Sequence, residues 1–303
     1  MISLGFFIAI GWGLTFAVTK GSIDHISPLL FVSLRFLIAS VALIPVLLWS
    51  RTRGVSVPRA VFTLKSILSG IFVGAFLFIG YWLQSLGLQS TSASQAGFIM
   101  GLAPVMVPFL AIIFLKITVP ARAWFGVLLV VAGLPLLSLD SALEMTPGTF
   151  YCIGSAIFFS FHVVLIQYFL KTIPVVTLTF IQITATGLIS LAAVGYLEPM
   201  SLEAIEGVLS DKLLLYSLLF CGVGATAVAT LVQCYLQQNL SIVKCALIFS
   251  TEPVFAAIFG YLLLDERMSA LQAAGALLVF LGVLEGELGL IASVRLLKGA
   301  RFR

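Results

Sequence analysis

The sequence predicts an all-α integral membrane protein in which about ten transmembrane helices form two inverted five-helix repeats. The first observation is composition: 61% of the 303 residues are hydrophobic and 9% are charged, whereas a soluble domain carries about 25% charged residues. The second is a series of about ten continuous apolar runs, which favours helices over the short alternating segments of a β-barrel. The third is that the second half of the chain repeats the first.

The apolar runs are long enough for transmembrane helices, which need about 20 mostly apolar residues each. The first run lacks a basic leader and a small-residue cleavage site, so we expect an uncleaved transmembrane helix there and not a signal peptide. In chain order the runs cover residues 2–19, 28–50, 64–86, 93–115, 122–139, 148–170, 174–197, 212–236, 243–264 and 270–291.

The distribution of Lys and Arg predicts which side of the membrane each loop faces. With the N-terminus in the cytoplasm, twelve of the 16 basic residues lie in cytoplasmic loops or in a basic tail at 293–303, three lie outside, and Arg35 lies within a span. We therefore expect both termini in the cytoplasm and a multi-pass location in the inner (plasma) membrane. The cytoplasmic set is Arg51, Arg53, Arg59, Lys65, Lys116, Arg122, Lys171, Lys244, Arg295, Lys298, Arg301 and Arg303, and the outer set is Lys20, Lys212 and Arg267.

The internal repeat is clearest in the stretch Ser241–Gly282, which predicts two helices joined by a tight charged turn. An earlier stretch matches it without a gap at a constant offset of 149 residues. Two repeats, 1–139 and 140–292, hold about five spans each, so the second enters the membrane from the opposite side, as in many secondary transporters with a midplane site. The matched pairs include Gln84 and Gln233, Ser92 and Ser241, Pro104 and Pro253, Gly126 and Gly275, and Gly133 and Gly282.

Short motifs occur in the first two predicted spans and in the second repeat. Trp12-Gly13 lies in the first span, and Ser27-Pro28 followed by Arg35-Phe36 lies at and within the second. Together with the second-repeat motif, they resemble EamA-type members of the drug/metabolite transporter superfamily over nearly the whole chain. The residues of that motif are Lys244, Glu252, Pro253, Val254, Phe255, Glu266, Gly275 and Gly282.

This resemblance implies a ten-helix fold of two inverted five-helix repeats around a central substrate cavity that is open to one side at a time. Members of the family move amino acids, other metabolites, drugs or nucleotide-linked compounds, and many bacterial members are exporters. The first repeat departs from the family pattern, which leaves the substrate open. Ala103 stands in place of the Glu before Pro104, Lys116-Ile117-Thr118 in place of the acidic turn, and Phe161-His162 in place of the Trp-Gly pair.

Ionisable residues within spans are candidate binding or coupling residues, because a charge at the bilayer centre costs about 2.5–3.5 kcal/mol on insertion scales. Arg35 can hold a substrate carboxylate, or it can be a structural residue that pairs with backbone carbonyls or extends toward the interface. Glu252 is a candidate proton or cation site, or a structural residue beside Pro253. His162 can couple protons or serve as a hydrogen-bonded packing residue. Lys244 can attract an anion at the cytoplasmic mouth or anchor the span.

Amide and aromatic side chains form a second group of candidates. Intramembrane amides either join helices or orient a substrate, and aromatic rings either pack in the core or stack a substrate that is apolar or cationic. Gln84 and Gln233 are equivalent in the two repeats, so they can face each other across the twofold axis. The candidates in this group are Trp12, Tyr81, Trp82, Gln84, Gln95, Phe98 and Gln233.

These features favour a secondary transporter that works by alternating access on a small amphipathic metabolite, such as an amino acid, with export as the leading direction. The alternatives are an importer or exchanger and, further off, a channel or a membrane scaffold. An enzyme is not expected, because the spans hold no second histidine, no H-E-x-x-H and no G-x-S-x-G, and the chain has no P-loop of a nucleotide-driven pump. We expect no cofactor, metal or nucleic acid; the partners are a small molecule, the bilayer and, as one option, protons, in a monomer or homodimer. The four cysteines, Cys152, Cys221, Cys234 and Cys245, are interpreted as small core residues.

Overall fold

The computed structural model describes residues 1–52, 62–136, 146–198, 208, 210–264 and 269–288, and in these parts of the chain the regular structure is helical throughout. The predicted basic tail at 293–303 and the acidic turn at Asp265-Glu266 lie outside the described residues. The helices are α1 (Ile2–Ser22), α2 (Pro28–Thr52), α3 (Leu64–Leu88), α4 (Ala93–Met100), α5 (Leu102–Leu115), α6 (Ala121–Leu136), α7 (Pro147–Phe169), α8 (Val175–Leu197), α10 (Lys212–Leu219), the π-helix η1 (Phe220–Val228), α11 (Ala229–Asn239), α12 (Ile242–Phe249), α13 (Glu252–Leu264) and α14 (Ala270–Leu288).

The predicted spans are confirmed as helices. Eight continuous helical stretches are long and apolar enough to cross a membrane, three of them built from consecutive elements: α4–α5, α10–η1–α11 and α12–α13. The remaining two, α6 and α14, are shorter apolar helices. The all-α membrane fold class is therefore as expected from the length and composition of the apolar runs.

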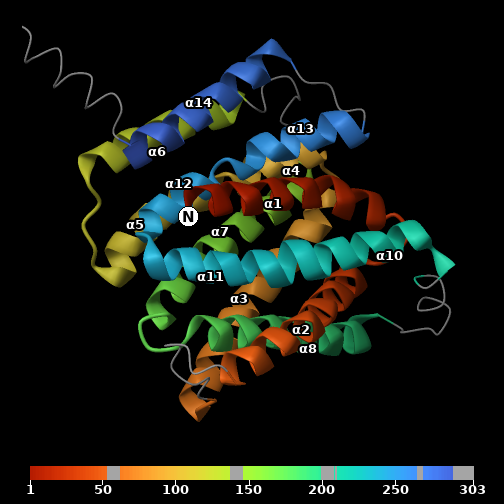
Figure 1. Cartoon of the computed structure of the whole chain (residues 1–303). Helices are drawn as coiled ribbons and strands as arrows, with labels where there is room; N and C mark the ends of the chain where they lie inside the picture. The colour runs from red at the N-terminus through yellow and green to blue at the C-terminus, as the bar shows by residue number, and fades with distance from the viewer. Residues whose placement is uncertain (53–61, 137–145, 199–207, 209, 265–268, 289–303) are drawn as a thin grey trace, which may run out of the picture.

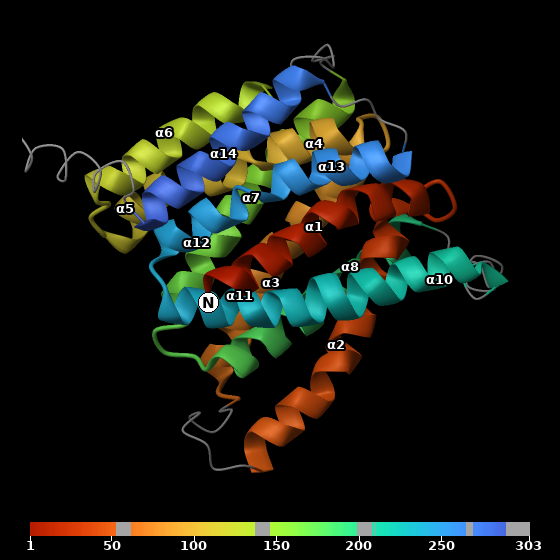
Figure 2. The ribbon, with the colours of Figure 1, turned by 45° about the horizontal axis from the view of Figure 1, so that its top comes forward.

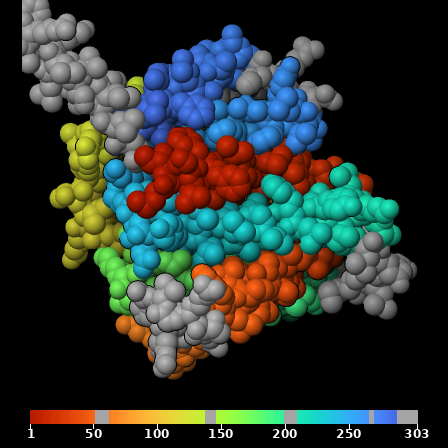
Figure 3. Space-filling model, viewed as in Figure 1, coloured from red at the N-terminus to blue at the C-terminus, as the bar shows by residue number. Residues whose placement is uncertain are grey.

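The packing of the helices repeats when the two halves of the chain are exchanged. Equivalent helices pair with each other, α2 with α8 and α6 with α14, and α5 packs on α12 as α13 packs on α4. Contacts between non-equivalent helices occur twice, since α3 packs on α7 as α11 packs on α1, and α3 packs on α8 as η1 packs on α2. Figures 1 and 2 show α6 and α14 side by side at one edge, and Figure 3 shows α1 between the second-repeat helices on either side of it. This exchange is the pattern expected of a twofold axis between inverted repeats.

The α6–α14 pair contains a close helix crossing between the repeats, with backbone on both sides. A Cβ atom added at Gly126 would lie 2.6 Å from the carbonyl oxygen of Gly282, and one added at Gly282 would lie 2.7 Å from the carbonyl oxygen of Gly126. Gly133 stands in the same relation to Gly275, at 2.7 Å. The offset of 149 residues exchanges these two contacts, so the matched glycines of the sequence repeat meet at the crossing. Small residues at such crossings allow backbones to approach closely in membranes.

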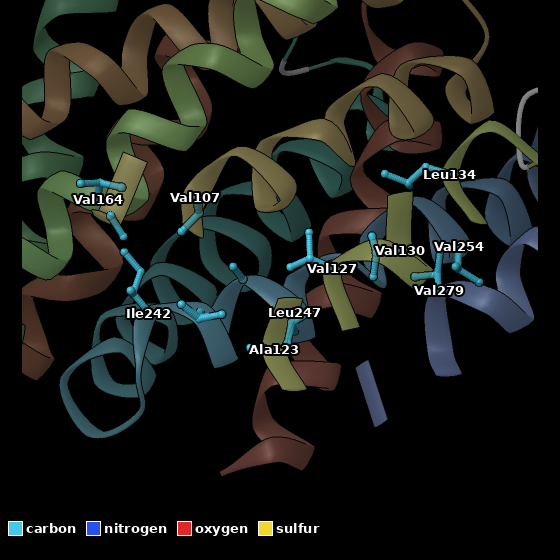
Figure 4. Close-up of a cluster of buried hydrophobic side chains, with 13 residues drawn as sticks. Val107, Ala123, Val127, Val130, Leu134, Val164, Ile242, Leu247, Val254 and Val279 are labelled. Atoms are coloured by element: carbon cyan, nitrogen blue, oxygen red, sulfur yellow. The ribbon is translucent and has the colours of Figure 1, made fainter. Parts of the chain in front are cut away.

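A buried apolar cluster connects this pair to the rest of the bundle. Its side chains come from α5, α6, α7, α12, α13 and α14, so it lies across both repeats (Figure 4). Tight packing of this kind supplies much of the attraction between helices in lipid, where burial from water gives little. The labelled members are Val107, Ala123, Val127, Val130, Leu134, Val164, Ile242, Leu247, Val254 and Val279.

The fourth and ninth spans are each interrupted near the middle, at equivalent positions. Gly101 separates α4 from α5, and Ser250-Thr251 separate α12 from α13. Pro104 and Pro253 follow three residues after the equivalent positions 101 and 250; a proline cannot donate its backbone nitrogen and collides with the carbonyl four residues earlier. In the ninth span the hydroxyl of Ser250 donates to the Leu247 carbonyl at 2.6 Å. Irregular backbone of this kind is tolerated inside a membrane where protein or a cavity surrounds it.

Candidate functional site: a central cavity

A cavity lies where the two interrupted spans meet α1, α3, α7 and α11. About 710 Å³ of its space, including the part open to solvent, is not filled by protein atoms. Both repeats contribute to its wall, as expected for a site on the twofold axis. The lining residues are Trp12, Thr15, Leu77, Tyr81, Gln84, Met100, Ala103, Pro104, Val107, Phe159, His162, Val163, Thr230, Gln233, Ala246, Phe249 and Glu252.

Two buried amides occupy equivalent positions in the wall. Gln84 of α3 is 7% exposed and Gln233 of α11 is 4% exposed, and both line the cavity. Neither side chain has a hydrogen-bond partner among the described residues. A buried amide without a partner costs about 1–3 kcal/mol, so both side chains are placed to bind a polar group or water inside the cavity.

Four aromatic rings in the wall form two edge-to-face pairs. The centroids of Trp12 and Phe249 are 5.3 Å apart, and those of Tyr81 and Phe159 are 4.9 Å apart. The Trp12 indole is fixed by donating from Nε1 to the Ala225 carbonyl at 3.0 Å. Such pairs are rigid and present both ring faces and ring edges to a ligand.

Glu252 is the acidic residue of the cavity wall and begins α13. In the described part of the chain its carboxylate makes no hydrogen bond or ion pair. The first turn of a helix carries partial positive charge, which favours a carboxylate there. Gly13 lets α1 approach this helix, since a Cβ atom added at Gly13 would lie 2.4 Å from Cβ of Phe255. The Trp12-Gly13 motif therefore brings its tryptophan into the same cavity as Glu252.

Arg35 is fully buried, with 1% of its surface exposed. Its Nε donates to Oγ1 of Thr226 in η1 at 2.6 Å. The guanidinium carbon lies 4.5 Å from the centroid of the Tyr81 ring, and Nη2 is 3.4 Å from the Tyr81 hydroxyl. Tyr81 lines the cavity, whereas Arg35 is not among its lining residues. In this arrangement the guanidinium joins α2 to η1 and α3.

His162 lines the cavity and belongs to a chain of buried polar groups behind it. Its Nε2 lies 2.8 Å from Oε1 of Gln182 in α8, and Nε2 of Gln182 donates to Sγ of Cys234 in α11 at 3.4 Å. The histidine Nε2 carries the proton in this arrangement because the amide oxygen can only accept. The chain fixes the imidazole ring relative to three helices.

The remaining candidates lie away from the cavity. Trp82 stacks on Phe78 at 5.7 Å in a cluster with helices α2, α8 and α10. Phe98 packs among buried apolar residues of α4 and its neighbours, and Lys244 is partly buried near the start of α12. Gln95 is buried in α4, and its Nε2 has no partner among the described groups. Trp12, Tyr81, Gln84, His162, Gln233 and Glu252 are thus the sequence candidates that the structure brings together.

Several wall residues were not among the sequence candidates. Thr15, Thr230 and the rings of Phe159 and Phe249 line the cavity. Thr230 could have been found, because it is equivalent to Tyr81 at the offset of 149 residues. The sequence candidates also omit Glu285, a buried carboxylate in α14 that is 4% exposed and lies outside the cavity lining. An acid within the predicted span 270–291 was the available signal.

Polar contacts tie the helices together at the end of the bundle where α1 passes into α2. Nζ of Lys20 in α1 donates to the carbonyl oxygens of Leu88, at the end of α3, and Thr91. Ser27 donates to the carboxylate of Glu198 at the end of α8. His25 lies 3.5 Å from a carboxylate oxygen of Asp211, which also caps α10. These contacts connect α1, α2, α3, α8 and α10 at this end, which we call the α1–α2 end.

Comparisons with a family model and with known proteins all indicate a membrane transporter. The sequence model of the EamA-like transporter family matches residues 1–139 and again 146–284. An uncharacterised transporter of Archaeoglobus fulgidus is 29% identical over 91% of this chain and 82% of its own length. The uncharacterised transporter YyaM of Bacillus subtilis is 28% identical over 93% of this chain and 90% of its own length. A solved crystal structure has the same fold, with a TM-score of 0.74 and 20% identity over 94% of this chain and 96% of the other.

Proposed function

Because the chain belongs to the EamA-like transporter family, both of whose repeats it contains, we propose that this membrane transporter moves a small amphipathic metabolite, such as an amino acid, by alternating access. Export is the proposed direction, and import or exchange is the alternative. The observation that carries the proposal is the central cavity, whose wall combines free amides, aromatic rings and one carboxylate from both repeats. A wall that is polar at a few points and apolar elsewhere suits a small amphipathic ligand.

The twofold arrangement supports alternating access. In inverted repeats, each half can adopt the conformation of the other, and this exchange opens the opposite side of a fixed midplane site. The cavity contains equivalent residues of the two repeats, such as Gln84 with Gln233 and Met100 with Phe249. A substrate held between these residues therefore meets similar groups whichever end of the bundle is open.

The polar contacts at the α1–α2 end support a closed gate there. Lys20 links α1 to the α3–α4 connection, and Ser27 links the start of α2 to the end of α8. The excess of basic residues in the loops at the opposite end supports a cytoplasmic N-terminus. We therefore propose that the tied end faces outward and that this conformation is closed to the outside.

Two residues of the wall are proposed for coupling transport to protons. Glu252 can carry a proton or leave it for a cation, and His162 is the histidine among the described wall residues. His162 is held by Gln182 through Nε2, whereas Glu252 has no described partner. Glu252 is therefore the first choice, and His162 is the second.

The experiment is efflux and counterflow from proteoliposomes with a pooled panel of amino acids and common metabolites, followed by mass spectrometry with and without a pH gradient. We expect at least one compound to exchange saturably. Ala103→Phe places a ring in the cavity and should reduce exchange at least tenfold, whereas Ala132→Phe, on the exposed side of α6, should leave it near the wild-type rate. Exchange that is equally fast in both variants would contradict the assignment of this cavity.

A further inference from the structure

We infer that the central cavity recognises a positively charged amine, with Glu252 as the counter-ion and Trp12, Phe159 and Phe249 as aromatic walls. This inference rests on the proposed transport function and narrows its substrate class to compounds with an ammonium group. It follows from which charges reach the cavity, from what its aromatic rings already contact, and from the polar groups that remain free.

The charge balance of the wall is the first argument. Glu252 lines the cavity, whereas no Lys or Arg is among its described lining residues. A carboxylate in an apolar surrounding requires a proton or a cation close by. Arg35 acts electrostatically on Glu252, but no nitrogen of Arg35 lies within ion-pair distance of it in the described structure. Because Glu252 lines the cavity, a cation bound there can supply a direct partner for its carboxylate.

The position of Arg35 argues against an anionic substrate. Its guanidinium lies over the Tyr81 ring and contacts Thr226 and the Tyr81 hydroxyl. An anion entering the cavity would meet the carboxylate of Glu252, whereas Arg35 is not among the residues that line the cavity. A cation would meet Glu252 directly.

The aromatic rings provide the second part of the site. Ring faces carry partial negative charge and attract ammonium groups within about 6 Å of the centroid. Tyr81 already has a guanidinium over its ring, so the rings left for a ligand are those of Trp12, Phe159 and Phe249. Trp12 gives the strongest cation–π contact of the common side chains, and its indole nitrogen is already bonded to Ala225. Its ring is therefore fixed as a wall of the cavity.

The two free amides complete the recognition. Gln84 and Gln233 are both buried and line the cavity without a partner among the described residues. Their carbonyl oxygens can accept from an ammonium N–H, and their NH2 groups can donate to a carbonyl or carboxylate on the same ligand. The site thus accepts a cation and also a zwitterion, provided that the ammonium group is present.

The test compares four charge states of one carbon skeleton with the full-length protein in nanodiscs. The probes are leucine methyl ester, leucine, N-acetylleucine and N-acetylleucine methyl ester, which are cationic, zwitterionic, anionic and neutral; the phenylalanine series serves as a larger skeleton. Choline and its neutral carbon analogue 3,3-dimethylbutan-1-ol form a further pair. Binding is followed by tryptophan fluorescence and by thermal stabilisation, which rises with ligand saturation.

We expect the ammonium-bearing members to bind, and N-acetylation to weaken binding at least tenfold. Glu252→Gln should weaken binding of the methyl ester at least tenfold, whereas the control Glu285→Gln removes a buried carboxylate outside the cavity lining and should change it less than twofold. Acetylated members that bind as tightly as the amines, or a panel in which no ammonium compound binds, would overturn the inference. The wild-type series decides this even if a variant does not fold.

The outcomes also separate this inference from the transport proposal. Saturable transport of a neutral or anionic metabolite, together with no ammonium binding, would keep the transporter and refute the amine site. Ammonium binding that depends on Glu252, together with no exchange of any bound compound, would keep the amine site and refute the carrier.

Discussion

Substituting Gly126 by Ala tests the close α6–α14 crossing of the two repeats. The added Cβ would lie 2.6 Å from the carbonyl oxygen of Gly282 and 3.1 Å from the backbone of Gly286. Ordinary contacts at such atoms are about 3.4 Å or longer, so α6 and α14 must separate locally by about 0.8 Å. Backbone atoms on both sides leave no flexible side chain to absorb this shift.

The expected cost is the difference between two opposing effects. Overpacking a tight interface costs about 1–3 kcal/mol, and a gap of about 0.5–1 Å loses a quarter to a half of the affected van der Waals attraction. Alanine in place of glycine within a helix stabilises the folded state by about 0.5–1 kcal/mol. We therefore expect Gly126→Ala to destabilise the protein by about 0.5–2 kcal/mol, with a lower melting temperature in detergent.

The control and a double variant make this prediction specific. Gly11 in α1 has open space around its added Cβ, so Gly11→Ala should leave the melting temperature unchanged or raise it. Gly126→Ala with Gly282→Ala should cost clearly less than the sum of the single variants, because both methyl groups force the same two backbones apart. The assay is size-exclusion chromatography after heating. A Gly126→Ala protein as stable as Gly11→Ala would refute the close crossing.

Three further predictions concern the polar groups. Arg35→Lys loses the forked contact with Thr226 and Tyr81, so the free energy of unfolding should fall by about 1.5–3 kcal/mol. Tyr81→Phe removes only the 3.4 Å contact and should lower the free energy of unfolding less. Equal stability of the two variants would contradict this. Lys20→Met should open the α1–α2 end and speed labelling of Thr15→Cys by an impermeant maleimide several-fold, whereas Lys171→Met at the other end should not; unchanged labelling would contradict the gate. Glu252→Gln should fold and abolish the pH dependence of transport, and pH dependence retained in this variant would exclude Glu252 as the coupling site.

The sequence predicted the spans and their duplication because both can be recognised from local sequence patterns. Apolar runs of sufficient length have few alternatives in lipid, and a gap-free repeat needs no knowledge of packing. The matched glycines and Ser92 with Ser241 have structural causes: the glycines form the α6–α14 crossing, and both serines accept from the backbone nitrogen three residues later. Such positions are dictated by backbone geometry, which similar sequences share.

The cavity wall was harder to predict because it depends on how each helix is rotated. Tyr81 and Trp82 are neighbours, yet successive residues of a helix point about 100° apart, and only Tyr81 lines the cavity. Pro104 and Pro253 predicted a disturbed turn in the spans 93–115 and 243–264, but not that each span would divide into two half-helices. Arg35 posed a third difficulty, since its place beside Tyr81 depends on η1, where the π-helix carries Thr226 toward α2. Rotations and breaks of this kind arise from tertiary packing, which one sequence does not display.

The duplication makes the cavity symmetric in its amides and asymmetric in its charge. Gln84 and Gln233 are equivalent, but the position equivalent to Glu252 is Ala103, and both of these positions line the cavity. A cation bound at Glu252 therefore has no equivalent acid to which it can transfer during a transport cycle. Glu252 follows the central break of its span, so the same carboxylate can be reached from either end as the flanking half-helices tilt. A single midplane counter-ion thus favours one shared site exposed alternately over a relay between two sites.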